Sequence, residues 1–256
     1  MPASDDKSPP GTGDTRGFKE LPVEFVKAES SVWTRESFLE AVNAPDQPPL
    51  FARIARRRER LRRLKPKPLH KSYLGRELSH DKTHVTASTI SLSPRYGTML
   101  YALARAFGAR HALEAGSGYG ISSMYLAIAL AESGADSRLF SFELASYANQ
   151  AQRSLDLITH GDSERGKVLR EDFNALGVHL PAGETFDLVF IDSRHDRDTL
   201  IRSYKTAYGW MAPRSMILID DIGYSGSSRE GWEEMIARNE FPFAALVNER
   251  IGVLSA

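Results

Sequence analysis

Apolar residues along the last two thirds of the chain fall into two alternating patterns. Helix-length segments with apolar positions three and four residues apart, such as ISSMYLAIALAES at 121–133, alternate with short apolar runs that are typical of buried strands. Strands that alternate with helices form a mostly parallel sheet with helices on both faces. The strand-like runs occupy residues 111–116, 138–143, 166–172, 185–192 and 215–221.

Two more apolar runs, FAALV at 243–247 and RIGVL at 250–254, flank Asn248 and Glu249 near the end of the chain. The short spacing between them predicts a tight antiparallel β-hairpin. Together with the five earlier runs, this hairpin predicts an α/β fold whose sheet is seven-stranded and mostly parallel. The connections between the parallel strands are expected to be right-handed.

The first third of the chain has a different character. Residues 1–20 are polar and contain Pro and Gly, and we expect a disordered tail because they offer almost nothing to bury. Residues 21–88 are predicted to be mostly helical, with Thr34 as the cap of one helix and LFARIARRRERLRRLK at 50–65 as another. We interpret this region as an N-terminal helical cap that contributes to substrate binding and oligomerisation, in front of a second unit at 89–256.

The composition is that of an ordinary globular protein, with 41% hydrophobic and 26% charged residues. No apolar stretch approaches 18 residues, and the polar N-terminus lacks the apolar core of a signal peptide, so we expect no membrane span. The absence of cysteine excludes disulfides and thiolate metal sites. These features predict a cytoplasmic protein.

The formal net charge is zero, but the basic residues are unevenly distributed. Residues 53–67 contain nine Lys or Arg and one Glu, which leaves 24 of the 33 basic and 32 of the 33 acidic residues elsewhere. An RNA-modifying enzyme would use such a patch. No RNA-binding signature accompanies it, so a solvated helix face or a contact with an acidic neighbouring subunit is favoured, and nucleic acid is not an expected partner.

A glycine-rich turn, LEAGSGYGISS at 113–123, follows the first of these strands. Its glycines, which include Gly116 and Gly118, give the pattern GxGxG instead of the GxGxxG of dinucleotide-binding folds. This spacing disfavours a dinucleotide-dependent oxidoreductase. Glu114, two residues before the first glycine, suits a cationic or amine-bearing ligand better than a pyrophosphate.

Polar residues also stand where the neighbouring elements begin or end. Ser122 and Ser123 open the helix after the turn, where a ligand carboxylate can bind near the helix N-terminus. The second strand ends at Glu143, a position at which an acid can bind ribose hydroxyls, and the third ends at Asp172.

With these features the segment from about 89 to 256 resembles the class I S-adenosylmethionine-dependent methyltransferases, above all the small-molecule O-methyltransferases that include catechol, caffeoyl-CoA and macrolide-sugar enzymes. The resemblance implies a Rossmann-like fold and S-adenosylmethionine as cofactor. It implies that Gly116 and Gly118 approach the amino-acid part of the cofactor, that Glu143 holds the ribose and that Asp172 lies near the adenine. The matching pieces occur in order and end in the hairpin: LEAGSGYGISSMYLA, SFE, REDF, FDLVFIDSRHD and MILIDDI.

Three aspartates follow the fourth and fifth strands in this reading, Asp192 after the fourth and Asp220 and Asp221 after the fifth. Adjacent carboxylates at the end of an apolar strand repel each other and lose hydration, so we expect a positive partner there. Oxygen ligands suit a hard divalent cation, and we predict that the three aspartates bind Mg²⁺. Metal-dependent members of the family carry acidic ligands at these places, and Asp192 is also expected to border the cofactor.

His195 lies three residues after Asp192 and is the predicted general base, because imidazole titrates near neutral pH. The expected function is therefore Mg²⁺-assisted methyl transfer from S-adenosylmethionine to a hydroxyl of a small molecule such as a phenol, sugar or macrocycle. A metal-independent small-molecule N- or O-methyltransferase, an RNA methyltransferase and a non-catalytic binding module remain as alternatives. Residues 69–95 are expected to line the substrate site, and a homo-oligomer is expected.

Overall fold

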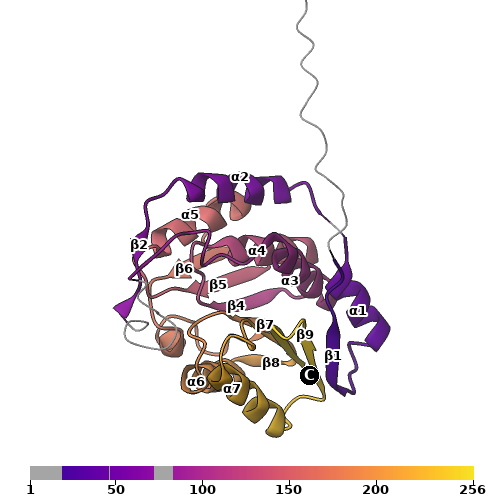
Figure 1. Cartoon of the computed structure of the whole chain (residues 1–256). Helices are drawn as coiled ribbons and strands as arrows, with labels where there is room; N and C mark the ends of the chain where they lie inside the picture. The colour runs from indigo at the N-terminus through magenta and orange to yellow at the C-terminus, as the bar shows by residue number, and fades with distance from the viewer. Residues whose placement is uncertain (1–18, 46, 72–82) are drawn as a thin grey trace, which may run out of the picture.

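The computed structural model of the chain describes residues 19–45, 47–71 and 83–256. These residues form three layers, with a central sheet between two layers of helices (Figure 1). The strands of the main sheet are β1 (Val23–Ala28), β4 (His111–Ala115), β5 (Arg138–Phe142), β6 (Gly166–Leu169), β7 (Phe186–Ile191), β8 (Met211–Ile219), β9 (Phe243–Val247) and β10 (Ile251–Ser255).

The sheet has the order β1-β9-β10-β8-β7-β4-β5-β6. The five strands β6, β5, β4, β7 and β8 are parallel, whereas β10 pairs antiparallel with both β8 and β9. This arrangement confirms the predicted Rossmann-like class with a C-terminal antiparallel hairpin. The hairpin turn contains Asn248 and Glu249, whose φ angles of 50° and 56° are left-handed, as a tight two-residue turn requires.

The sheet has eight strands where the sequence predicts seven, because β1 was expected to belong to a helical cap. β1 pairs antiparallel with β9 and extends the sheet at that edge. Its pattern of half-buried and exposed residues alternates, which is the period of a strand with one buried face. Phe25 packs edge-on against Phe38 and Phe243, at ring-centroid distances of 5.8 and 6.1 Å. The segment is therefore part of the sheet and its core, although its six residues are too short for a strong pattern.

Helices cover both faces of the sheet (Figure 1). One layer contains α3 and α4 packed together with α5, and the other contains α6 and α7. α2 lies across the outside of α4 and α5, and its own residues Ile54 and Leu61 are buried. The helices are α1 (Arg35–Asn43), α2 (Phe51–Arg62), α3 (Pro94–Phe107), α4 (Ile121–Ser133), α5 (Ala148–Thr159), α6 (Arg197–Tyr208) and α7 (Gly226–Ala237), with a 3₁₀ helix η2 (Phe173–Val178).

The predicted helix at Thr34 is present, and Thr34 caps α1 through its side chain. Ser37 completes a capping box although glutamate is the usual residue there. After α2, the short strands β2 (Lys67–Pro68) and β3 (His84–Val85) form a separate antiparallel pair. Most of the predicted disordered tail at 1–20, and part of the predicted substrate lining at 69–95, lie outside the described residues. None of the helices in the described part of the chain is long and apolar enough to cross a membrane.

Candidate active site

The glycine-rich turn connects the end of β4 with the start of α4. Gly116 and Gly118 have φ angles of 89° and 54°, which favour glycine because other residues rarely adopt them. A Cβ at Gly116 would lie 2.1 Å from the backbone oxygen of Asp192, so the turn passes close to the end of β7. The amide of Gly118 donates a hydrogen bond of 2.8 Å to Glu143 Oε2, which joins the turn to the end of β5.

A cleft opens beside this turn, at the carboxyl ends of the parallel strands. Three of the predicted cofactor residues, Gly116, Glu143 and Asp172, line it together. Asp172 accepts hydrogen bonds from the amide and the side chain of Asn174 and thereby caps η2. The other lining residues are Phe142, Leu144, Glu171, Phe173, Asn174, Ser193, Arg194, Thr199, Arg202 and Ser203.

Glu143 is held in the cleft wall by backbone donors. Besides the Gly118 amide, the amide of Ala145 donates to Glu143 Oε1 at 2.8 Å. Burial raises the pKa of Glu143 to about 7, and the nearby Glu114 adds to the effect, although the backbone amides oppose it. The carboxyl group is therefore close to the balance between its protonated and ionised forms at neutral pH.

Glu114 lies deeper than the cleft. It is fully buried in β4, and it accepts hydrogen bonds from the hydroxyls of Ser123, at 2.5 Å, and Ser141. Burial raises the pKa of this carboxyl group. Ser122 is also buried, and neither it nor Ser123 is among the described residues that line the cleft. The Ser123 hydroxyl thus has an internal partner, and the ligand carboxylate that the sequence suggests at this helix start stays a prediction.

The surroundings of the turn contain buried polar atoms without partners among the described residues. They are Glu114 Oε1, Ser117 Oγ, Tyr119 Oη and Ser193 Oγ. Unsatisfied buried polar groups are rare and call for a specific explanation. Their presence around the glycine-rich turn is consistent with a polar ligand at the cleft.

The acidic pair after β8 has a positive partner within the chain. Arg250, in the hairpin, forms two hydrogen bonds with Asp220, from Nε to Oδ1 at 2.6 Å and from Nη2 to Oδ2 at 2.7 Å. Asp220 is almost completely buried, and its backbone amide continues the sheet by donating to Ile191 O. Arg250 Nε also lies 3.2 Å from Asp221 Oδ1, and its guanidinium lies over the ring of Tyr96. Burial alone would lower the pKa of Arg250, but the hydrogen bonds and charges of these carboxylates raise it, so the guanidinium stays charged.

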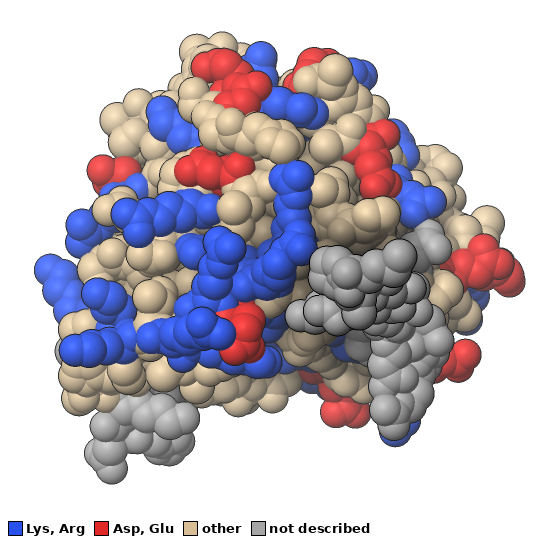
Figure 2. Space-filling model, turned by 90° about the horizontal axis from the view of Figure 1, so that it is seen from above, with Lys and Arg blue, Asp and Glu red and all other residues tan. Residues whose placement is uncertain are grey.

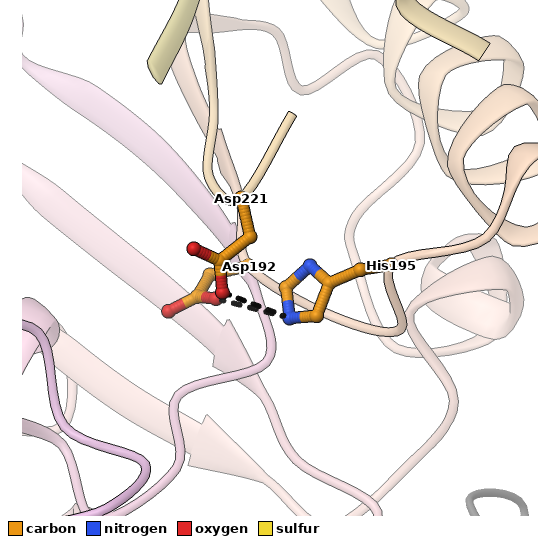
Figure 3. Close-up of side chains that lie close together, drawn as sticks. All are labelled: Asp192, His195 and Asp221. Carbon is orange, nitrogen blue, oxygen red and sulfur yellow. Dashed lines mark ion pairs between the residues drawn. The ribbon is translucent and has the colours of Figure 1, made fainter. Parts of the chain in front are cut away.

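The other two aspartates face His195 (Figure 3). His195 Nε2 lies 3.5 Å from Asp221 Oδ2 and 4.0 Å from Asp192 Oδ1. One ligand atom from each of the three residues lies within 4.8 Å of the others. Burial and the neighbouring aspartates raise the pKa of Asp192 well above its usual range, and burial and Asp220 raise that of Asp221. This concentration of acidic oxygens favours a cation or a shared proton between them.

The backbone around His195 is fixed by α7. The carbonyl oxygen of His195 accepts hydrogen bonds from the hydroxyls of Ser228 and Ser225, at 2.8 and 3.2 Å, at the start of that helix. The His195 ring lies 5.6 Å from the ring of Tyr224, which is about half exposed. Tyr224 therefore forms an accessible wall beside the imidazole.

The predicted metal ligands differ from the observed grouping in one residue. The sequence predicts Asp192, Asp220 and Asp221, whereas the structure groups Asp192 and Asp221 with His195 and pairs Asp220 with Arg250. The reason is that the chain returns next to β8 through the hairpin, which brings residue 250 to residue 220. Sequence reasoning missed Arg250, Tyr224 and Ser193 because no motif marks them. The only available signal was that the acidic pair requires a cation.

Comparisons with known proteins agree with this architecture. Residues 113–222 match the family model described as a methyltransferase domain, and no curated protein matches the sequence. Similar solved structures include the O-methyltransferase TomG from Streptomyces achromogenes, in complex with SAM, which is 22% identical with a TM-score of 0.54. That match covers 65% of this chain and 82% of TomG.

Two further solved structures share the fold. Cofactor-bound Rv0187 from MTB is 20% identical with a TM-score of 0.56, covering 89% of this chain and 98% of that one. An O-methyltransferase from Bacillus cereus in complex with SAH is 20% identical with a TM-score of 0.52, covering 66% of this chain and 86% of that one. The matched segment and the shared fold agree with the methyltransferase domain that the sequence predicts.

Proposed function

We propose that the protein transfers the methyl group of S-adenosylmethionine to a hydroxyl oxygen of a small molecule. The observation that carries this proposal is the cluster of Asp192, His195 and Asp221 beside the cofactor cleft, at the ends of β7 and β8. In this cluster the His195 imidazole, a proton acceptor, lies close to the two carboxylates. The cluster stands at the edge of the sheet where ligands bind in open α/β folds. The O-methyltransferases among the similar structures support the same type of acceptor atom.

In this proposal the cofactor lies along the glycine-rich turn. Glu143 accepts hydrogen bonds from the ribose hydroxyls, Asp172 lies near the adenine, and Gly116 and Gly118 allow the amino-acid part to approach the backbone. Ser117 and Ser193 have unpartnered buried hydroxyls next to these positions and are added to the binding set. Glu114, Ser122 and Ser123 act one layer further in and support the turn from behind, and Glu114 Oε1 is a buried acceptor without a partner among the described residues.

Asp192 and Asp221 are the proposed ligands of a divalent cation, most suitably Mg²⁺, because each offers a carboxylate oxygen in one small region. Such a cation lowers the pKa of an acceptor hydroxyl and directs its oxygen. Asp220 is assigned to Arg250, whose charge already balances one carboxylate. Burial and the neighbouring carboxylates raise the pKa values of Asp192 and Asp221, and a bound cation would favour their ionised forms.

His195 Nε2 takes the proton from the acceptor hydroxyl as the oxygen attacks the methyl carbon. Asp221, at 3.5 Å from Nε2, stabilises the imidazolium that forms. One observation favours a second candidate, a metal-independent methyltransferase. Arg250 supplies a permanent cation at the acidic pair, so His195 and Arg250 together meet the electrostatic needs of the site without a metal.

The acceptor class, the oligomeric state and the cellular location are also part of the proposal. The acceptor class, a natural-product phenol, sugar or macrocycle, rests on the resemblance and on the accessible aromatic wall formed by Tyr224. We propose a homo-oligomer, for which the basic surface of α2 offers a charged contact. A cytoplasmic location remains a prediction from the sequence.

The proposal is tested by a methyl-transfer screen against phenols, sugars and macrocycles, with S-adenosylhomocysteine as the measured product. EDTA should abolish turnover and Mg²⁺ should restore it. His195→Gln should retain binding of S-adenosylhomocysteine but lose about 10²–10⁴ in rate, a loss that shrinks at high pH where the acceptor ionises unaided. His160→Asn, at an exposed helix end, is the control. Full activity in EDTA would select the metal-independent candidate, and full activity of His195→Gln would remove the general base.

A further inference from the structure

The inner face of α2 forms hydrogen bonds with α5 through arginines of the basic run. Arg53 Nη1 donates to the carbonyl oxygen of Leu157 at 2.7 Å. Arg57 makes three contacts one turn away, with Nε to Ser154 Oγ at 2.8 Å and Nη2 to the backbone and side-chain oxygens of Gln150 at 2.9 and 3.0 Å. Part of the basic run is therefore occupied by specific internal hydrogen bonds.

Ser154 connects this contact to the glycine-rich turn. It is fully buried, and its hydroxyl donates to the carbonyl oxygen of Tyr119 at 2.6 Å. Tyr119 stands between Gly118 and Gly120, both with left-handed φ angles. A Cβ at Gly120 would lie 3.0 Å from Ser154 Cβ, so the turn rests directly on this part of α5.

The single hydrogen of the Ser154 hydroxyl has two possible acceptors. Tyr119 O lies at 2.6 Å and Gln150 O, one helical turn back, lies at 2.9 Å. The second choice is the common one for serine within a helix. Arg57 donates to Gln150 O and to Ser154 Oγ at the same time, so it occupies the competing acceptor and directs the hydroxyl hydrogen toward Tyr119.

This placement of a guanidinium is electrostatically costly. Burial and the neighbouring Arg153 and Arg60 lower the pKa of Arg57, which means that its charge is disfavoured there. A planar group with several directed donors is what the three acceptors require, and lysine does not provide it.

We propose that Arg57 is a positioning residue for cofactor binding, which acts through Ser154 to hold the Tyr119 carbonyl and the glycine-rich turn in the binding conformation. The N-terminal region then contributes to cofactor affinity without touching the cofactor. This inference rests on the proposed cofactor site at the turn and is independent of the proposed metal, general base and acceptor.

The test measures the affinity for S-adenosylhomocysteine by calorimetry. Arg57→Ala should raise the Kd about three- to tenfold, the effect of one or two lost hydrogen bonds. Arg53→Ala is the matched control, because it removes the same charge and a hydrogen bond to the same helix but no contact with Ser154. It should leave the Kd within about twofold. If Arg57→Ala does not fold, Arg57→Gln and Arg57→Lys replace it, and both should raise the Kd at an unchanged melting temperature.

Ser154→Ala supplies a readout that general destabilisation would not produce. The two residues act in series, so the double variant Arg57→Ala/Ser154→Ala should bind no more weakly than Ser154→Ala alone. Additive losses, an unchanged Kd in Arg57→Ala, or equal losses in Arg53→Ala would each overturn the inference. Failure of the wild-type protein to bind S-adenosylhomocysteine would instead contradict the cofactor site itself.

Discussion

At the scale of single residues, Glu143 links cofactor binding to pH. Its pKa of about 7 means that, below neutral pH, the carboxyl group holds a proton when the cofactor is absent. In the proposed site, ribose hydroxyls would donate to the ionised form of Glu143 and favour it, so binding should release a proton. The affinity for S-adenosylhomocysteine should therefore rise with pH up to about 7 and then level off. Calorimetry in buffers of different ionisation enthalpy measures both effects.

The Glu143 carboxyl group also makes the stability of the free protein depend on pH, but this stability falls as pH rises, whereas the cofactor affinity increases. Between the ordinary pKa of 4.5 and about 7 the folded protein keeps a proton that the unfolded chain has released. Its contribution to the free energy of unfolding therefore falls as pH rises through this window, by on the order of 3 kcal/mol in total. Glu143→Gln should remove both pH dependences, and a variant that keeps them would show that another group titrates.

Arg250 and Asp220 make a second residue-scale prediction. Arg250→Met leaves the buried Asp220 carboxylate without its partner, and it should lower the free energy of unfolding by about 2–4 kcal/mol. Asp220→Asn should recover part of that loss when it is added to Arg250→Met. Arg197→Met, which removes a similar contact of a more exposed arginine with Glu234, should cost much less because water screens that pair. Urea denaturation compares them, and equal losses would show that Arg250 is not needed as a counterion.

At the scale of elements, the sequence predicts what local pattern determines. α4 spans 121–133 as expected because its apolar residues face the sheet, α3 and α2 together, and α3 ends at Gly108 in a left-handed conformation that glycine adopts readily. Gly116, Glu143 and Asp172 are predicted as cofactor residues because they follow the ends of parallel strands. They meet in one cleft, as that rule requires.

What the sequence could not supply are contacts that depend on how distant segments pair. The sequence of β1 gives no sign that it leaves the helical region, because its strand conformation depends on hydrogen bonding to β9. In the sequence Arg250 is only one residue of a hairpin turn. It lies beside Asp220 because β10 pairs with β8. In the same way, nothing in the run of arginines indicates which of them point toward α5, since that choice is made by the packing of α2.

At the scale of the whole molecule, the charge is segregated although the net charge is zero. Figure 2 shows Lys and Arg gathered on the face that carries α2. The exposed members of the run are Arg56, Arg60, Arg62, Arg63, Lys65 and Lys67. Like charges at four-residue spacing destabilise a helix slightly, so an acidic surface of another subunit would relieve this repulsion.

This segregation predicts an assembly that salt weakens. Light scattering at low ionic strength should give a mass above the 28.5 kDa of one chain, and about 0.5 M salt, which shortens the screening length to ~4 Å, should reduce it. Arg56→Glu/Arg60→Glu should give the monomer at both salt concentrations. Lys205→Glu/Arg229→Glu changes the net charge equally on α6 and α7, on the opposite face of the sheet, and should leave the assembly intact. A mass of 28.5 kDa for the wild-type chain at every salt concentration would contradict the proposed oligomer and leave the outer face of α2 as a solvated surface.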